Sequence, residues 1–307
     1  MTEAVDATST PETENPPTAR FTYPAGDGLL VHAYRWDAEG PVRGIVQLTH
    51  GMGEHALRYG HLAATLTAAG FVVYAQDHRG HGTTGTADGG EQGAIGAAGW
   101  GALVDDVDRL RAHARGEHPG VPLVLLGHSM GSFAVQQYLL DSSDRIDAAV
   151  LTGTAVLDLL EPAMDLDAEM DLSAFNAPFA PARTDYDWLS RDDAQVDKYV
   201  ADPNCGFGLD GPAVRAMFEA ARPLADADRM AGIRADLPLY VAVGDQDPVN
   251  GQLALAHALL DRYRAAGLTD VTFHAYEGAR HEVFNETNRD EVEADLVAWL
   301  DRVVPAR

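Results

Sequence analysis

One pentapeptide limits the folds open to this chain. Residues 127–131 read Gly-His-Ser-Met-Gly and stand between an apolar run at 122–126 and a helix-forming run at 132–140. A buried strand that turns at once into a helix needs glycines on both sides of its central residue, because side chains there collide with neighbouring backbone. The pattern predicts a tight turn that lifts the Ser129 hydroxyl clear of a sheet, at a helix N-terminus that favours negative charge.

The same alternation of strand and helix continues along the chain. Apolar runs typical of strands lie at 30–34, 45–49, 71–75, 148–151, 239–243 and 271–276. Amphipathic runs typical of helices lie at 59–69, 100–114, 252–265 and 290–303. Continuous apolar strands separated by amphipathic helices predict an α/β fold, with a mostly parallel central sheet and helices on both faces.

One stretch, residues 154–236, shows no clear strand and is too long for a bare loop in a compact domain. Helix-like pieces at 192–200 and 211–221 predict a helical cap, inserted between two parts of the core at 20–153 and 237–307. The apolar side chains of the cap either pack it onto the core or line a pocket. They are Leu159, Leu160, Met164, Leu172, Phe175, Phe179, Trp188, Tyr199, Phe207, Met217 and Phe218.

The charge of the chain argues against two classes of partner. A formal net charge of −25 repels nucleic-acid phosphates and leaves no basic patch for anionic membranes. No apolar run approaches the roughly 18 residues of a membrane-spanning helix. Residues 1–19 are acidic and rich in Thr and Pro, which predicts a disordered tail and not a signal peptide. We therefore expect a cytoplasmic protein with no nucleic-acid partner and no stable membrane insertion.

A serine hydroxyl becomes a good nucleophile only when a base takes its proton. That base must lie at the carboxyl ends of the strands, where Ser129 is expected. Among twelve histidines, His281 fits best, because its loop lies between the last expected strand and the last helix. His274 falls inside a strand, and His113 and His118 fall in or just after a surface helix.

The base needs a carboxylate to orient its ring and support its positive charge. Residues 244–249 follow a strand directly and offer two aspartates. Asp245 adjoins the glycine that ends the strand, and it can instead hold the turn. Asp247 lies further out and is followed by a stiffening proline, so we favour Asp247. The chain order of the three groups is then Ser129, Asp247, His281.

Acyl transfer also needs N–H donors for the oxyanion that forms in the transition state. The backbone N–H of Met130, directly after the nucleophile, is the first candidate. The second is the backbone N–H of Met52, in the Gly-rich loop at 50–55 (His-Gly-Met-Gly-Glu-His) that follows a strand. Chemistry of this kind requires neither a metal nor an organic cofactor.

Two features resemble metal sites without having the spacing of zinc ligands. The motif at 77–82, Asp-His-Arg-Gly-His-Gly, is too crowded, and we expect a hydrogen-bonded structural loop beside the active site. Cys205 is the only cysteine, so the chain forms no intrachain disulfide. Its immediate neighbours show no ligand spacing, and we expect a structural thiol.

Several segments together resemble the monoacylglycerol lipase and lysophospholipase group of α/β-hydrolases, from about residue 20 to the C-terminus. They lie at 50–55, 58–82, 127–132, 244–249 and 278–286. The resemblance implies the α/β-hydrolase fold, in which the chain order Ser, Asp, His is the rule. It places the triad of the group on Ser129, Asp247 and His281, and its oxyanion donors on Met52 and Met130. The chain departs from the group at 83–84, where two threonines replace a usual serine.

The expected function is serine-dependent hydrolysis of carboxylic esters through an acyl-enzyme, with a monoacylglycerol or lysophospholipid-type ester as partner. A thioesterase, amidase, perhydrolase or carbon–carbon hydrolase with the same triad stays open. So do a ligand receptor and a scaffold protein built on this fold. Dehalogenases of the fold are disfavoured because they use an aspartate where Ser129 stands. The sequence carries no signal for an oligomeric state.

Overall fold

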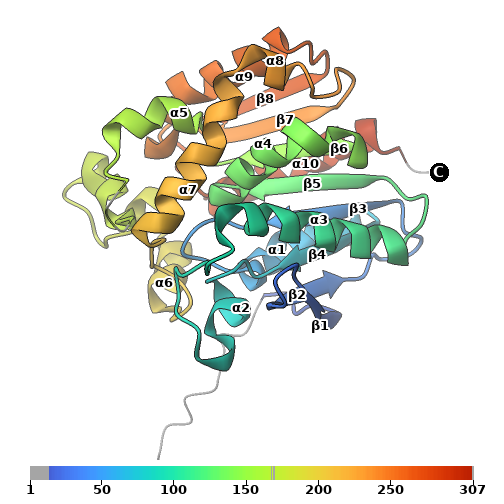
Figure 1. The fold of residues 1–307 in the computed structure, drawn as a ribbon, viewed down its shortest axis with the longest axis horizontal. Helices are drawn as coiled ribbons and strands as arrows, with labels where there is room; N and C mark the ends of the chain where they lie inside the picture. The colour runs from blue at the N-terminus through green and yellow to red at the C-terminus, as the bar shows by residue number, and fades with distance from the viewer. Residues whose placement is uncertain (1–13, 167, 169, 306–307) are drawn as a thin grey trace, which may run out of the picture.

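The computed structural model describes residues 14–166, 168 and 170–305, whose strands form one eight-stranded sheet (Figure 1). The strand order is β1-β2-β4-β3-β5-β6-β7-β8. The strands are β1 (Ala19–Pro24), β2 (Leu30–Trp36), β3 (Gly44–Thr49), β4 (Phe71–Gln76), β5 (Leu123–His128), β6 (Ala148–Thr152), β7 (Leu239–Gly244) and β8 (Val271–Tyr276). Strands β3 to β8 run parallel to one another, and β1 and β2 pair antiparallel, which confirms the mostly parallel sheet predicted.

Helices cover both faces of the sheet, as the apolar runs predict (Figure 1). One face packs against α3 (Gly99–Glu117), α4 (Met130–Ser142) and α9 (Ala254–Ala265). The other packs against α1 (Gly60–Ala68) and α10 (Arg289–Val303). Every residue of β3, β4, β5, β6 and β7 is buried, because each side chain meets one of these two helical layers.

Strand β1 lies at the sheet edge and was not expected as an element. Tyr23 is the one buried residue of β1. The sequence of β1 therefore lacks the continuous run of apolar residues that marks the inner strands. The predicted tail, 1–19, falls mostly on residues 1–13, which lie outside the described part of the chain. Within the described part, the Asn15 carbonyl accepts the indole N–H of Trp36 at 2.9 Å, and β1 begins at Ala19.

Between β6 and β7, the described residues form helices and turns but no strand. The α-helices there are α5 (Leu157–Leu160), α6 (Asp193–Ala201), α7 (Gly211–Ala221) and α8 (Ala227–Met230). The 3-10 helices are η4 (Glu161–Ala163), η5 (Leu172–Phe179), η6 (Asp187–Leu189) and η7 (Arg222–Ala225). Helices α5, α6 and α7 gather at one end of the sheet, on the left in Figure 1. The division of the chain into core at 20–153 and 237–307 and cap at 154–236 stays a prediction.

None of the helices in the described residues combines the length and the apolar character that crossing a membrane requires.

Candidate active site

Ser129 occupies a strained turn between β5 and α4. Its backbone has φ 51° and ψ −122°, a conformation that residues other than glycine rarely adopt. A Cβ added to Gly127 would lie 2.6 Å from the carbonyl oxygen of Gly131, and one added to Gly131 would lie 2.1 Å from that of Thr49. The two glycines of the pentapeptide are therefore required by backbone contacts, as the pattern predicts. Helix α4 begins directly after the serine, at Met130.

The structure brings His281 and Asp247 together. The Nδ1 atom of His281 lies 2.9 Å from Oδ2 of Asp247, and both side chains are almost completely buried. The other carboxylate oxygen of Asp247 accepts the backbone N–H of Val249 at 2.9 Å. Asp245, the alternative aspartate, instead accepts the backbone N–H of Gly278 at 2.8 Å and holds the loop after β8.

His281 is arranged to act as a base. Since Asp247 accepts from Nδ1–H, the lone pair of the ring lies on Nε2. Burial lowers the pKa of His281, but the charge and the hydrogen bond of Asp247 outweigh it, and the pKa is raised. The ring packs between Trp188 and His128, at centroid distances of 4.8 and 4.9 Å. Burial lowers the pKa of His128 to about 3, so that this neighbour is neutral.

Ser129 and His281 border one cavity of about 50 Å³. Met52 and Met130, which carry the predicted oxyanion donors, also border it. Eight of the eleven apolar cap residues line this cavity: Leu160, Met164, Leu172, Phe175, Trp188, Tyr199, Met217 and Phe218. The roles assigned to individual catalytic residues stay predictions, but the structure places four of the five around a single apolar space and the fifth, Asp247, against His281.

Three of the apolar cap residues lie elsewhere. Leu159 is exposed to 51%. The ring of Phe179 packs under the guanidinium of Arg280, and that of Phe207 packs against His81 at a centroid distance of 5.0 Å. Helical periodicity does not separate these residues from the lining, because the cap consists of short α-helices, short 3-10 helices and turns.

The Gly51 loop, residues 50–55, carries Met52 and is held close to Ser129. The backbone N–H of Gly51 donates to Glu54 Oε1 at 2.6 Å, and a Cβ on Gly51 would lie only 3.1 Å from the Ser129 Cβ. Nε2 of His50 accepts the backbone N–H of His78 at 3.0 Å, so Nδ1 of His50 carries its hydrogen and donates to the Gly51 carbonyl at 2.7 Å. These contacts fix a glycine backbone beside the nucleophile.

A buried ionic network of Arg58, Glu54 and Glu282 lies beside the cavity, and it was not predicted from the sequence. Arg58 donates to Glu54 at 2.6 Å and to both carboxylate oxygens of Glu282 at 2.6 and 2.8 Å, and its guanidinium lies over the Tyr199 ring. Burial raises the pKa of Glu282, but the Arg58 charge outweighs it and the pKa is lowered. The network joins the Gly51 loop to the residue after His281. Arg58 and Glu282 stand 224 positions apart, so no local pattern signals it.

The Asp-His-Arg-Gly-His-Gly motif forms the structural loop expected of it. Asp77 accepts the Tyr34 hydroxyl at 2.7 Å and the Ala56 backbone N–H at 3.0 Å, and Arg79 is paired with the buried Asp106 at 2.6 Å. Cys205 is largely enclosed, and burial raises the pKa of its thiol well above the ordinary range. Such a thiol is not a reactive nucleophile.

The sheet order, the helices on both faces and the strained serine turn define an α/β-hydrolase. The chain belongs to the Hydrolase_4 family, described as serine aminopeptidase S33, whose pattern it matches over residues 40–288. It is 36% identical to the monoacylglycerol lipase of Mycolicibacterium smegmatis over 272 residues, which are 86% of this chain and 90% of that lipase. It is 30% identical to the monoglyceride lipase of Mus musculus over 291 residues, which are 91% and 89% of the two chains.

A solved structure of an esterase has the same fold. A highly thermostable carboxyl esterase from Bacillus coagulans, crystallised with glycerol, superposes with a TM-score of 0.82 at 27% identity. The match covers 93% of this chain and 98% of the esterase. These comparisons confirm the predicted fold and the resemblance to monoacylglycerol lipases, and they identify the protein as a carboxylic ester hydrolase.

Proposed function

We propose that this hydrolase acts through an acyl-enzyme on Ser129, and that its substrates are lipid esters of the monoacylglycerol or lysophospholipid type. One observation carries the proposal. The strained Ser129 and the buried His281, which is paired with Asp247, border a single, largely apolar cavity. A nucleophile, its base and an apolar lining suited to an acyl chain therefore meet at one place.

The reaction follows from these positions. Nε2 of His281 takes the Ser129 proton as Oγ attacks the ester carbonyl. The backbone N–H groups of Met52 and Met130 bind the oxyanion, while Asp247 stays ionised and stabilises the imidazolium. His281 then protonates the departing alcohol. Water, activated by the same histidine, hydrolyses the acyl-enzyme and releases the acid.

The charges around the cavity favour an uncharged head group. The carboxylates that line it, Glu54 and Glu282, are both paired with Arg58. Among the described lining residues there is no lysine or arginine to meet a phosphate. Desolvating an unpaired phosphate is costly, so a glycerol ester fits this lining better than a phosphate-bearing one. Two of the relatives are themselves named monoacylglycerol or monoglyceride lipases.

The test is hydrolysis of p-nitrophenyl esters from acetate to palmitate, together with a monoacylglycerol and a lysophospholipid, using Ser129→Ala as control. Activity that rises toward octanoate or longer, includes the monoacylglycerol and disappears in the variant supports the proposal. Activity confined to acetate and butyrate refutes the lipid substrate but keeps the serine esterase. If no ester is hydrolysed in a serine-dependent way, the amidase, carbon–carbon hydrolase and receptor alternatives take its place.

A further inference from the structure

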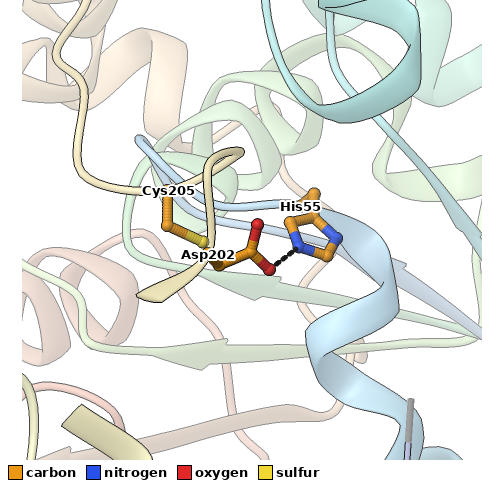
Figure 2. A group of neighbouring side chains, drawn as sticks. All are labelled: His55, Asp202 and Cys205. Atoms are coloured by element: carbon orange, nitrogen blue, oxygen red, sulfur yellow. Dashed lines mark hydrogen bonds and ion pairs between the residues drawn. The ribbon is translucent and has the colours of Figure 1, made fainter. Parts of the chain in front are cut away.

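We propose that His55, Asp202 and Cys205 form a binding site for a divalent transition-metal ion of the zinc type. His55 belongs to the Gly51 loop, and Asp202 and Cys205 belong to the turn after α6. The three side chains converge at one point (Figure 2). One ligand atom from each lies within 4.8 Å of the other two. Sequence spacing alone predicts a purely structural thiol here, because His55 stands 150 positions before Cys205 and the pairing exists only in the fold.

The donor set selects the class of metal. An imidazole nitrogen, a carboxylate oxygen and a thiolate sulfur suit a borderline ion such as Zn²⁺, whereas Mg²⁺ and Ca²⁺ prefer oxygen donors alone. On binding, Cys205 releases its proton to solvent, and the sulfur takes the metal in its place. The carboxylate of Asp202 and the thiolate together carry two negative charges, which balance the ion. Water completes a tetrahedral set.

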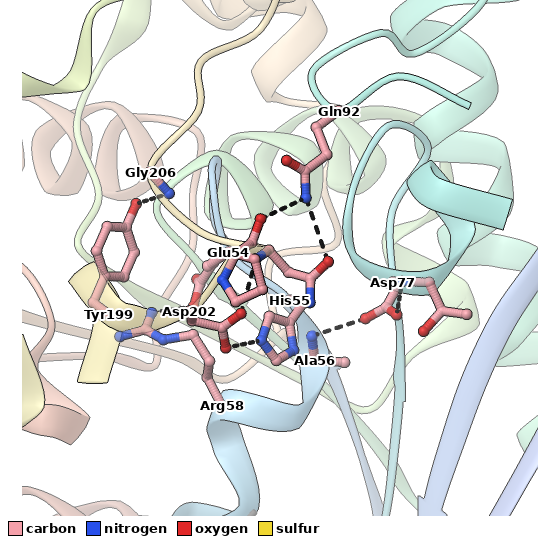
Figure 3. A network of polar contacts seen from close by, with 12 residues as sticks. Glu54, His55, Ala56, Arg58, Asp77, Gln92, Tyr199, Asp202 and Gly206 are labelled. Atoms are coloured by element: carbon pink, nitrogen blue, oxygen red, sulfur yellow. Dashed lines mark hydrogen bonds and ion pairs between the residues drawn. The ribbon is translucent and has the colours of Figure 1, made fainter. Parts of the chain in front are cut away.

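The turn that bears two of the ligands is already folded. Asp202 accepts the Asn204 backbone N–H at 2.8 Å through Oδ1, which leaves Oδ2 facing His55 Nε2 at 2.9 Å. The Cys205 backbone N–H donates to the Asp202 carbonyl at 3.0 Å, so both ligands stand on one turn with two residues between them. Gln92, which Figure 3 shows beside this turn, donates to the Pro203 carbonyl at 3.1 Å and to the Asn204 side chain at 3.3 Å. Little backbone movement separates this arrangement from a metal site.

The surroundings provide both an entry path and a suitable charge. His55 and Asp202 line a second cavity, separate from the one at Ser129, with side chains 11% and 10% exposed. The charge of Arg58 acts on both Asp202 and Cys205. Because Arg58 is paired with two carboxylates, Glu54 and Glu282, this group carries no net positive charge that would repel a metal ion. The strongly acidic chain also attracts cations to its surface.

A bound ion would add a link between cap and core. The turn already contacts the Gly51 loop, because the Gly206 backbone N–H donates to the Gly53 carbonyl at 3.0 Å. The same N–H also donates to the Tyr199 hydroxyl at 3.2 Å (Figure 3). Coordination would fix the same turn to His55 as well, and an ion that binds only the folded chain raises its thermal stability. The inference goes beyond the proposed ester hydrolysis, and metal binding can be measured without any substrate.

The test is a titration of the metal-free full-length protein with Co²⁺, followed by its thiolate-to-cobalt charge-transfer absorption. Because Cys205 is the only cysteine, any such band reports this site. We expect one Co²⁺ per chain, displaced by Zn²⁺, and no band in Cys205→Ser. His55→Gln and Asp202→Asn should each weaken binding by at least about tenfold. The matched control is His113→Gln, which removes a surface histidine 3.8 Å from Glu117 with no thiol nearby.

A second readout protects the test against misfolded variants. Zn²⁺ should raise the melting temperature of the unaltered protein and of His113→Gln, but not that of Cys205→Ser, and circular dichroism without metal confirms that each variant is folded. Absence of the band at saturating Co²⁺ would overturn the proposal. So would wild-type affinity in folded His55→Gln and Asp202→Asn.

Discussion

Nδ1 of His281 lies 2.9 Å from a carboxylate oxygen of Asp247, and both side chains are almost completely buried. Asp247→Asn removes the acceptor that sets the histidine tautomer. We expect kcat/KM for ester hydrolysis to fall by about 10³ to 10⁴-fold, with little change in KM. The matched control is Asp245→Asn, which alters the loop contacts with Gly278 and Gln246. A larger loss in this control than in Asp247→Asn would reassign the acid.

The same pair sets the pH dependence. His281 must be neutral to accept a proton, so activity should fall as the pH drops through its pKa. Asp247 holds that pKa above the ordinary 6.5 despite the opposing effect of burial. The acid limb of kcat/KM against pH should therefore lie above pH 6.5 and move to lower pH in Asp247→Asn. An acid limb below pH 6.5 in the unaltered enzyme would contradict this assignment.

The Ser129 turn predicts a contrast between two glycines. Gly131→Ala places a Cβ 2.1 Å from the Thr49 carbonyl and 2.5 Å from that of His50, and both of these atoms belong to backbone that cannot give way cheaply. Activity should fall by at least about 100-fold, because a displacement of about 1 Å at the nucleophile already costs that much. Gly101→Ala, in α3, meets nothing within 4 Å and should leave activity unchanged while stabilising the helix by up to about 1 kcal/mol. Equal effects of the two changes on activity would refute the steric argument.

The local signals explain what could be predicted from the sequence. The apolar strand, the glycine pair and the following helix stand within some twenty residues, and each has its own physical requirement, so the Ser129 turn could be found. The positions of His281 and Asp247 follow from one rule, that loops after parallel strands meet at the same edge of the sheet.

What could not be predicted depends on contacts between distant residues. Arg58 meets Glu282, and His55 meets Cys205, only because the cap and the loops fold over the same end of the sheet. Strand β1 was missed because an edge strand with one face in solvent carries a weak apolar signal. The cap consists of short α-helices, short 3-10 helices and turns, and such short pieces carry no sustained hydrophobic period.

The network at Arg58 should contribute to stability. Arg58→Met leaves the buried carboxylates of Glu54 and Glu282 without their shared counter-ion, and breaking a buried ion pair in this way costs about 3–5 kcal/mol of unfolding free energy. Arg58→Lys keeps the charge but loses the two-pronged bond to Glu282, so its loss should be smaller. Urea denaturation of the two variants measures both values. Equal losses would show that the geometry of the guanidinium, and not its charge, is what matters.

Two adjacent leucines separate cavity lining from cap surface. Leu160 lines the cavity, whereas Leu159 is half exposed and does not. Leu160→Trp should fill acyl space and lower the ratio of octanoate to acetate hydrolysis by about tenfold, since shortening the bound chain by even two methylenes loses roughly 1.6 kcal/mol of burial. Leu159→Trp should leave the ratio unchanged. If the two changes shift chain-length preference alike, the cavity is not the acyl site.

The central claim is that an acyl group passes through Ser129. The direct measurement is an acid quench during turnover of p-nitrophenyl octanoate, followed by peptide mass mapping. The account predicts an octanoyl adduct on the peptide that contains Ser129, and neither adduct nor turnover in Ser129→Ala. Turnover that persists in Ser129→Ala, or an adduct carried by another residue, would contradict it.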